Sequence, residues 1–289
     1  MTTAMLPTES LAEGKPAPDS AAGPQGARRY IYCVVDGEAP AGFGAIGVGG
    51  NADVFAVARD GLSAIVSATS AEKLDITRGN AIAHQRVLEA VMRAGHTVLP
   101  VRFNTIAEDK GPKSAQQRII DHVLVGRRAE IVPLLARMRT VVELGVKGLW
   151  TNLAAVFRDL AGGSREIQSL RKNLLATTGP GTPGRRPVNV TVQIRLGELV
   201  KKALEAAKSD MEAALLGRLT PLAKDSRKNK TFGDPMFANL ALLVEASRQG
   251  EVEAVLSAFE AERAGQVKLR CVGPLPACNF LELVITWDD

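Results

Sequence analysis

The sequence is poor in aromatic and sulfur-containing side chains. Aromatic residues make up 4% of the 289 residues, and there are only three histidines and three cysteines. Cys33, Cys271 and Cys278 form no Cys-x-x-Cys pair, so we expect neither a zinc site nor a disulfide scaffold. This use of cysteine is typical of a protein that stays in a reducing cytoplasm.

Long apolar runs are also missing. No stretch approaches the roughly 18 residues that a helix needs to span a bilayer, and no signal peptide is evident at the N-terminus. We therefore expect no membrane segment. The hydrophobic fraction of 46% and the charged fraction of 23% are ordinary for a globular protein, and a chain of 289 residues predicts two domains. The net charge of +5 permits a nucleic acid or an acidic partner and requires neither.

The first half of the chain alternates strand-like and helix-like patterns. Residues 1–27 are rich in Ala, Pro, Gly and Ser and predict a disordered tail. The patterns that follow predict a strand at 29–37, a hairpin at 53–69 that turns at Asp60-Gly61, a helix at 77–94, a strand at 97–103, and a helix at 114–138 that is broken near Gly126 and Pro133. We expect an α+β domain at 28–138 with its helices on one face of the sheet.

The second half contains the longest helical pattern. The predicted order is a strand at 140–150, helices at 151–176, a breaker at 177–187, a long amphipathic helix at about 193–218, a strand at 239–247, a helix at 251–265, and closing strands at 266–272 and 280–287. This order predicts a second α+β domain at 139–289, ferredoxin-like and with a helical insertion.

Two features could carry chemistry, and neither is well supported. GFGAIG at 42–47 matches Gly-x-Gly-x-x-Gly, but no helix can start at Val-Gly-Gly-Asn to hold a pyrophosphate, so a loop between strands is favoured. His84 shares an apolar face with Val87, Leu88 and Val91, and no Cys, Ser or Asp completes a catalytic set, so a packed histidine is favoured over a general base or ligand. We expect no catalytic residues, cofactor site or metal site, and therefore no enzyme.

The basic excess is concentrated at 195–230. This segment holds nine Lys or Arg and five Asp or Glu residues. One interpretation is a nucleic-acid-binding module. Only Phe232 and Phe237 lie nearby to stack on bases, so a solvated helix face, or a docking face for an acidic partner, is favoured. Nucleic-acid binding stays as the alternative function.

The stretch LPVRFNT at 99–105 is the most unusual in the chain. Proline cannot donate to a strand ladder, so Pro100 predicts an edge strand or a bulge. Arg102 is either paired with a carboxylate or held for a partner. Asn104 begins a turn, since Asn tolerates left-handed backbone geometry.

LPVRFNT resembles the Leu-Pro-x-Arg-Phe-Gly-Thr signature of the gas vesicle protein GvpL/GvpF family. Further segments resemble the family in the same order: RYIYCVV, GLSAIVSAT, AHQRVLEAVM, ELGVKGLW and GPLPACNF. The resemblance covers about residues 30–287. It marks a set of positions as structural or partner-contacting: His84, Pro100, Arg102, Phe103, Asn104, Thr105, Gly273, Pro274 and Phe280.

This sequence departs from the family pattern at two places. Asn104 stands where the family usually has glycine. It is a fair substitute if the glycine serves left-handed geometry, but its side chain would obstruct a second backbone that passes close by. Leu275 and Cys278 replace bulkier aromatic residues in the closing segment.

The resemblance implies a function without catalysis. Members of the family are accessory proteins of gas vesicles, so it implies a cytoplasmic protein, associated with vesicles, that binds the small apolar shell subunit GvpA and other accessory proteins. Such binding would assist nucleation or assembly of the shell. Candidate contact surfaces are the sheet edges, whose backbone groups are unpaired, and an interdomain groove. For His84 and Arg102 a purely structural role is favoured.

Overall fold

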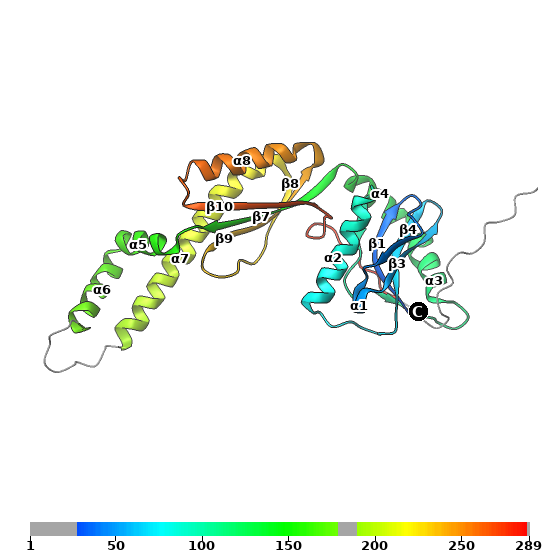
Figure 1. Ribbon diagram of the computed structural model, residues 1–289, viewed down its shortest axis with the longest axis horizontal. Helices are drawn as coiled ribbons and strands as arrows, with labels where there is room; N and C mark the ends of the chain where they lie inside the picture. The colour runs from blue at the N-terminus through cyan, green and yellow to red at the C-terminus, as the bar shows by residue number, and fades with distance from the viewer. Residues whose placement is uncertain (1–27, 179–189, 288–289) are drawn as a thin grey trace, which may run out of the picture.

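The computed structural model describes residues 28–178 and 190–287. The tail expected at 1–27 and most of the breaker expected at 177–187 lie outside the described residues. Figure 1 shows two units that follow one another along the long axis of an elongated molecule. We refer to them as the N-terminal unit and the C-terminal unit, and each contains one antiparallel sheet.

The N-terminal unit combines a six-stranded sheet with several helices. Its strands are β1 (Arg28–Asp36), β2 (Gly42–Ala45), β3 (Asp53–Arg59), β4 (Leu62–Thr69), β5 (Val98–Pro100) and β6 (Ile106–Ala107). Its helices are α2 (Arg78–Arg93), α3 (Ala115–Arg118), the π-helical turn η1 (Ile119–Val125) and α4 (Arg128–Met138), with a single turn, α1 (Val48–Asn51), before β3. The strand order is β2-β3-β4-β1-β5, and β6 also pairs with β1.

Local sequence signals account for much of this unit. The β3–β4 hairpin turns at Asp60 and Gly61, which both have positive φ, as the Asp-Gly pair predicts. The Thr77 side chain caps α2 by accepting a hydrogen bond from the Asn80 N–H, and Gly95, with φ of 92°, follows the end of the helix. Gly126 separates η1 from α4, whereas Pro133 lies inside α4 without ending it.

The first sheet is covered on both faces, so the expectation of helices on one face is wrong for this sheet. Tyr30 and Tyr32 of β1 belong to the core with Val87 of α2, whereas Ile31 belongs to a second core with Ile119 of η1. The two-residue alternation of β1 is interrupted by a bulge at Tyr32, between the pairs Ile31–Val66 and Cys33–Ile65. Because RYIYCVV is apolar at nearly every position, β1 supplies core side chains to both faces.

The C-terminal unit has a four-stranded sheet in the order β10-β7-β9-β8. Its strands are β7 (Val141–Trp150), β8 (Ala223–Lys228), β9 (Met236–Glu245) and β10 (Val267–Leu275). Its helices are α5 (Leu153–Gly163), α6 (Arg165–Thr178), α7 (Val190–Leu219) and α8 (Gln249–Ala261), with short 3-10 turns η2 (Thr220–Leu222) and η3 (Ala246–Arg248). The mixed α+β class with two sheets is as the sequence predicted.

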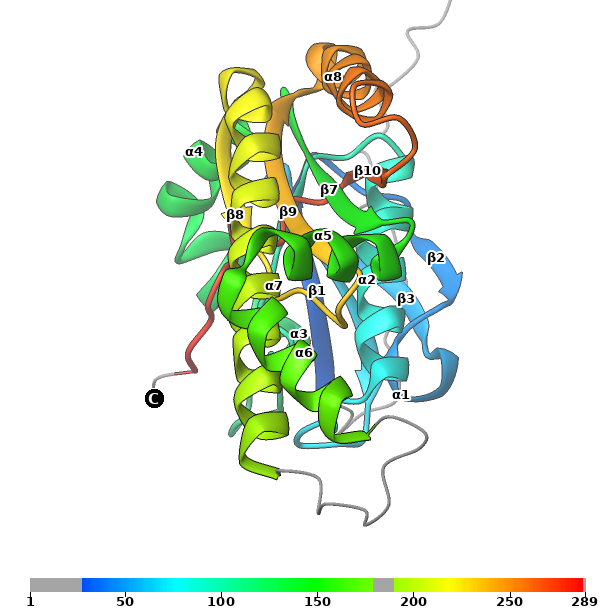
Figure 2. The ribbon, with the colours of Figure 1, turned by 90° about the vertical axis from the view of Figure 1, so that its left-hand side faces the viewer.

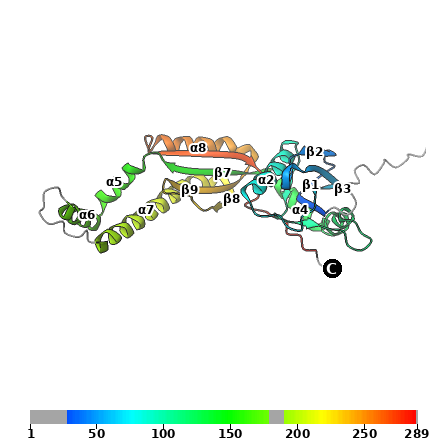
Figure 3. The ribbon, with the colours of Figure 1, turned by 60° about the horizontal axis from the view of Figure 1, so that its bottom comes forward.

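The long helices pack on one face of this second sheet. Leu215 of α7 and Phe259 of α8 are buried with Leu240 and Leu242 of β9 in a single core. The first turns of α7 extend past the sheet with α5 and α6, which form the helical insertion (Figures 1 and 3). In the end-on view of Figure 2, α5 and α6 lie in front of the sheet, beside α7.

The second sheet contains one strand that the sequence did not predict and lacks one that it did. The polar segment AKDSRK forms the edge strand β8, which its composition does not predict because it has no alternating apolar residues. The strand expected at 280–287 does not form. This segment makes a single parallel bridge, between Leu283 and Val101, and lies against the N-terminal unit.

Candidate functional site

The stretch around Pro100 lies at the edge of the first sheet, as proline predicts. Pro100 pairs with Cys33 of β1. The outer side of this strand is paired with residues of the C-terminal segment. The Leu283 N–H donates to the Pro100 carbonyl at 2.7 Å, and the Arg102 N–H donates to the Leu283 carbonyl at 3.1 Å. This part of the edge is therefore covered by the C-terminal segment of the same chain.

Arg102, Phe103 and Thr105 all make contacts inside the chain. The Arg102 guanidinium lies 3.1 Å from the Glu282 carboxylate. Of the two roles that the sequence left open for Arg102, the structure therefore shows pairing with a carboxylate of the same chain. The Phe103 ring packs edge-on against Tyr30, with 5.9 Å between ring centroids. The Thr105 hydroxyl donates to the Arg102 carbonyl at 2.7 Å and closes the turn.

Asn104 has the left-handed conformation that its place in the family signature requires, with φ of 68°. A second backbone does pass close by, and the Asn104 carboxamide binds it. Its oxygen accepts from the Leu74 N–H at 2.8 Å, and its nitrogen donates to the Leu74 carbonyl at 2.7 Å. The Asn104 side chain therefore joins the two loops. It does not obstruct the second backbone, which was the alternative that the sequence left open.

His84 is a packed histidine between aromatic rings. Its Nδ1 lies 2.9 Å from the Tyr30 hydroxyl, and its ring contacts those of Tyr32 and Phe103. Burial lowers the pKa of His84 to about 4, so the ring is neutral at neutral pH. The structural interpretation of this residue fits the geometry.

Two tyrosines are central to this cluster, and residue-by-residue reasoning did not single them out. The Tyr30 hydroxyl also accepts from the Asn104 N–H at 3.2 Å. The Tyr32 hydroxyl lies 2.8 Å from the Ser67 hydroxyl and accepts from the Val48 N–H at 2.9 Å. Burial raises the pKa of both tyrosines. The available signal was the Tyr-x-Tyr pattern in β1, since polar tips on buried rings need partners.

The closing positions Gly273, Pro274 and Phe280 lie on the C-terminal unit. The peptide bond between Gly273 and Pro274 is cis. Gly273 has a φ of 156°, and a Cβ there would lie 3.0 Å from the Glu143 carbonyl oxygen, so glycine is favoured where β10 passes close to β7. Phe280 packs with Val141 and Leu243. These three residues are therefore not brought together with His84 or Asn104.

Residues 276–287 connect the two units. Asn279 donates to the buried Glu143 carboxylate of β7 through its N–H at 2.9 Å and through its Nδ2 at 2.5 Å. Burial raises the pKa of Glu143. Farther along, Leu283 and Ile285 enter the core of the N-terminal unit. Sequence reasoning missed Glu143 and Asn279, because each resembles an ordinary polar residue until the fold buries Glu143 and places Asn279 beside it.

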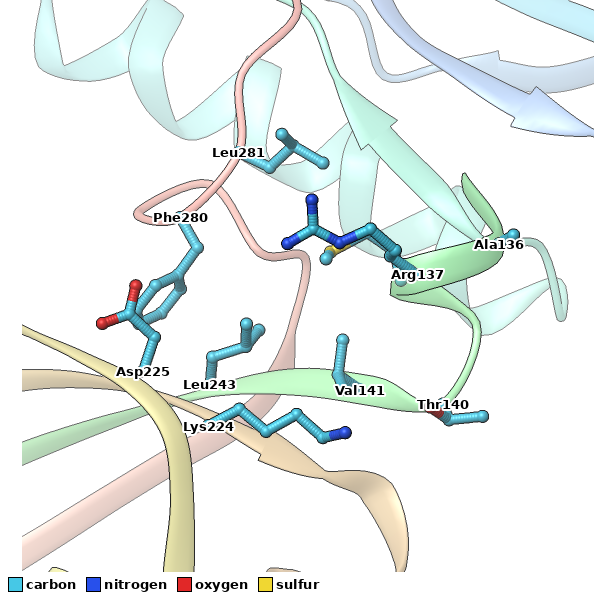
Figure 4. Close-up of a pocket in the computed structure, with 10 residues that line it drawn as sticks. Ala136, Arg137, Thr140, Val141, Lys224, Asp225, Leu243, Phe280 and Leu281 are labelled. Atoms are coloured by element: carbon cyan, nitrogen blue, oxygen red, sulfur yellow. The ribbon is translucent and has the colours of Figure 1, made fainter. Parts of the chain in front are cut away.

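A cavity of about 590 Å³ lies at the junction of the units. Figure 4 shows Arg137, from the end of α4, extending toward Leu281 beside the apolar side chains of Val141 and Leu243. Its lining residues are Ala136, Arg137, Met138, Thr140, Val141, Lys224, Asp225, Leu243, Phe280 and Leu281. The wall mixes apolar side chains with the charged groups of Arg137, Lys224 and Asp225 and contains no histidine or cysteine, a mixture that is suited to contact with a polypeptide.

The geometry supports neither a nucleotide-binding site at 42–47 nor a metal site among the described residues. Gly42–Ala45 form strand β2 where a loop was expected, and α1 is interrupted by the positive φ values of Gly49 and Gly50. A pyrophosphate would therefore meet no regular helix there. Within residues 28–178 and 190–287, no three His, Cys, Asp or Glu residues gather as a metal site.

Most cations of the basic segment at 195–230 are neutralised by carboxylates. Arg218 makes a bidentate pair with Glu262, at 2.8 and 2.7 Å, and Lys228 lies 2.6 Å from Glu212. Ion pairs involve six of the nine cations: Arg195, Lys208, Arg218, Lys224, Arg227 and Lys228. The segment is also divided between α7 and β8, so it presents no continuous phosphate-binding stripe.

In the part of the chain that the structure describes, no helix is long and apolar enough to cross a membrane.

A family model described as "Gas vesicle synthesis protein GvpL/GvpF" matches residues 28–282. The chain belongs to the GvpL/GvpF family. Gas vesicle protein F of Microcystis aeruginosa is 22% identical over 256 residues, which cover 88% of this chain and 98% of that protein. Gas vesicle protein L1 of Halobacterium salinarum is 34% identical over 150 residues, half of each chain.

Solved structures of family members have the same fold. The crystal structure of GvpF from Anabaena sp. PCC7120 aligns with a TM-score of 0.65 at 20% identity and covers 87% of this chain and 96% of that one. The GvpF structure from Microcystis aeruginosa aligns with a TM-score of 0.63 at 21% identity and covers 89% and 99%. Membership of the family gives this protein a role connected with gas vesicles.

Proposed function

We propose that this protein assists assembly of the gas vesicle shell by binding the small apolar shell subunit, a GvpA-like protein, in the cytoplasm. The observation that carries the proposal is the family match over residues 28–282, which includes both units and the segment that joins them. A subunit with an apolar surface aggregates unless that surface is covered before polymerisation. A protein that covers it reversibly would keep the subunit available for nucleation.

The shape of the molecule supports a binding role. Two sheets on separate units give a long surface, and the cavity at their junction has the apolar side chains of Val141, Leu243 and Phe280 in its wall. Its wall also holds the charged side chains of Arg137, Lys224 and Asp225, and surfaces that hold another polypeptide commonly combine apolar and polar groups in this way. Other accessory proteins of the vesicle are further proposed partners, and catalysis forms no part of the proposal.

Co-capture with the shell subunit tests this function. The tagged full-length chain and the shell subunit of the same gene cluster are produced together, and the tagged chain is recovered by affinity. We expect the subunit to be retained, and to stay soluble only when this chain is present. Recovery of the subunit at the level of an untagged control, with the chain folded, would contradict the proposal.

A further inference from the structure

The face of the second sheet that is turned away from α7 and α8 carries two adjacent cations. Arg270 of β10 stands directly opposite Lys147 of β7. Val146 and Leu269, their neighbours along the strands, belong to the core beneath α7 and α8. Because side chains alternate along a strand, Lys147 and Arg270 point to the opposite side, where both are exposed. We call this side the open face and define it by Lys147, Leu149, Met236, Asn239, Arg270 and Val272.

The pairing of Lys147 with Arg270 is unfavourable in the isolated chain. Like charges directly opposite each other on neighbouring strands destabilise a sheet. Among the described residues, neither side chain has an ion pair or a hydrogen bond, whereas Lys224 and Lys228 on β8, at the opposite edge of the sheet, each bind a carboxylate at 2.6 Å. A carboxylate placed between Lys147 and Arg270 would remove the repulsion and form charge-assisted hydrogen bonds with both.

Apolar side chains lie on both sides of this charge pair. Val272, two residues after Arg270, is 51% exposed. Toward the other end of the strands, Leu149 pairs with Met236, whose sulfur accepts a hydrogen bond from the Phe232 N–H, and the Phe232 side chain is 67% exposed. Cations flanked by apolar groups match a polypeptide that alternates acidic and apolar side chains.

The surroundings fit a protein partner better than a nucleic acid. Single-stranded nucleic acids need several exposed aromatic rings for stacking, and Phe232 is the one exposed aromatic residue near this face among the described residues. The part of the same face nearest the N-terminal unit is partly covered, because Phe280 packs there on Leu243 with the Arg227 guanidinium over its ring. Val272 borders this part and lines a cavity of about 460 Å³ with Glu89, Met92 and Arg93 of α2.

We propose that the open face is a docking surface for an acidic, amphipathic segment of a partner protein. The partner places a carboxylate between Lys147 and Arg270 and apolar side chains on Val272 and Met236. This inference deepens the proposed function, because it names a surface at which a vesicle protein docks. It rests on the proposed function only for the identity of that protein as the shell subunit.

Site-directed photo-crosslinking in vesicle-forming cells tests the docking surface. The full-length chain carries Val272→benzoylphenylalanine, and crosslinked peptides are identified by mass spectrometry. We expect a crosslink to an acidic, amphipathic segment of a vesicle protein. Adding the charge reversals K147E and R270E should lower its yield by about tenfold or more, since like charges across an interface cost several kcal/mol.

A second charge-reversed variant is the matched control. Lys201 and Lys202 on α7 are exposed, so K201E with K202E changes the net charge equally and leaves the open face intact. We expect this variant to keep the crosslink. Urea unfolding should confirm that both variants remain folded.

Several results would overturn the docking surface. They are no crosslink at position 272, a crosslink that survives K147E with R270E, equal loss in both variants, or a crosslink to nucleic acid. A charge-dependent crosslink to another vesicle protein, together with failed co-capture of the shell subunit, would uphold the surface and contradict the proposed function. Capture of the shell subunit without a crosslink at position 272 would uphold the proposed function and contradict the surface.

Discussion

Asn104 replaces the glycine of the family signature and adds two hydrogen bonds that a glycine could not make. Its backbone is left-handed, and its carboxamide makes two hydrogen bonds to Leu74. A glycine would relieve the backbone strain and lose both bonds. An alanine would keep the strain and also lose both bonds.

We therefore predict that Asn104→Ala destabilises the protein more than Asn104→Gly. The two lost hydrogen bonds cost about 1 kcal/mol each, and alanine adds about 1 kcal/mol for left-handed geometry. Urea unfolding of the two variants measures the difference. Equal stability of the two variants would show that backbone geometry contributes nothing at this position.

His84 predicts a specific pH dependence of stability. Its pKa is about 4 in the folded state, whereas an exposed histidine, which represents the unfolded state, has a pKa of 6.5. Between these values the unfolded chain binds a proton that the folded chain does not, so stability falls as the pH is lowered from 6.5 to 4. The loss attributable to His84 is about 3 kcal/mol in full, at about 1.4 kcal/mol per pH unit.

Comparison with His84→Gln isolates this contribution from those of other titrating groups. The difference in unfolding free energy between wild type and variant should change between about pH 7 and about pH 4.5, with the wild type losing more. A difference that stays constant over this range would mean that His84 is as accessible to protons in the folded chain as in the unfolded one.

At the scale of elements, the segment after Phe280 has the largest consequence. Leu283 is buried in the core of the N-terminal unit, although it follows the last strand of the C-terminal unit. Its neighbour Val284 is 37% exposed and provides a matched control. We predict that Leu283→Ala costs about 2–4 kcal/mol, because it leaves a cavity, and that Val284→Ala costs less than about 1 kcal/mol.

Thermal unfolding of the two alanine variants measures this contrast, with limited proteolysis to report whether the segment has detached. Similar, small effects of both substitutions would show that the C-terminal segment does not support the first sheet.

The Glu143–Asn279 contact should contribute more than the exposed Arg102–Glu282 pair. Asn279→Ala removes the side-chain donor, so the buried Glu143 carboxylate keeps only the bond from the backbone N–H, and the change should cost about 1–3 kcal/mol at about pH 7. Arg102→Ala should cost about 0–1 kcal/mol. Because burial raises the pKa of Glu143, the folded state binds a proton more readily than the unfolded state does. The cost of Asn279→Ala should therefore shrink as the pH is lowered, which unfolding at about pH 7 and about pH 5 would detect.

The sequence could predict those helices and turns that are determined by residues close to one another in the chain. The Asp60-Gly61 hairpin and the Thr77-capped helix α2 follow from turn chemistry and periodicity. Strand β8 was not predictable, because an edge strand of polar residues has no periodic signal. The same limit applies to residues 280–287, whose alternating apolar pattern predicts a strand but not that Leu283 packs against the other sheet.

At the scale of the whole molecule, the chain crosses twice between the units. It passes once from α4 into β7 and returns through residues 276–283 (Figure 1). The Arg139–Asp36 pair at 3.0 Å and the Glu143–Asn279 contact flank these crossings. Two connections restrain the relative orientation of the units more than one flexible linker would, which keeps the junction cavity and the open face in a fixed relation.

Only part of the candidate site could be predicted from the sequence, because its contacts join residues that are far apart in the chain. The motif positions were identified from their resemblance to a family, and the structure divides them between two units. Their hydrogen-bond partners, Tyr30 for His84 and Leu74 for Asn104, became apparent only from distances across the fold. The charge pair of Lys147 and Arg270 depends on strand register, which no local pattern specifies.

The proposed role in gas vesicle assembly can be tested by deleting the gene of this protein alone from a complete vesicle gene cluster. The readout is light scattering that disappears under pressure, since intact vesicles collapse and then no longer scatter. We expect the pressure-sensitive signal to be lost on deletion and to return when the gene is restored. An undiminished signal in a strain without a related gene would contradict it.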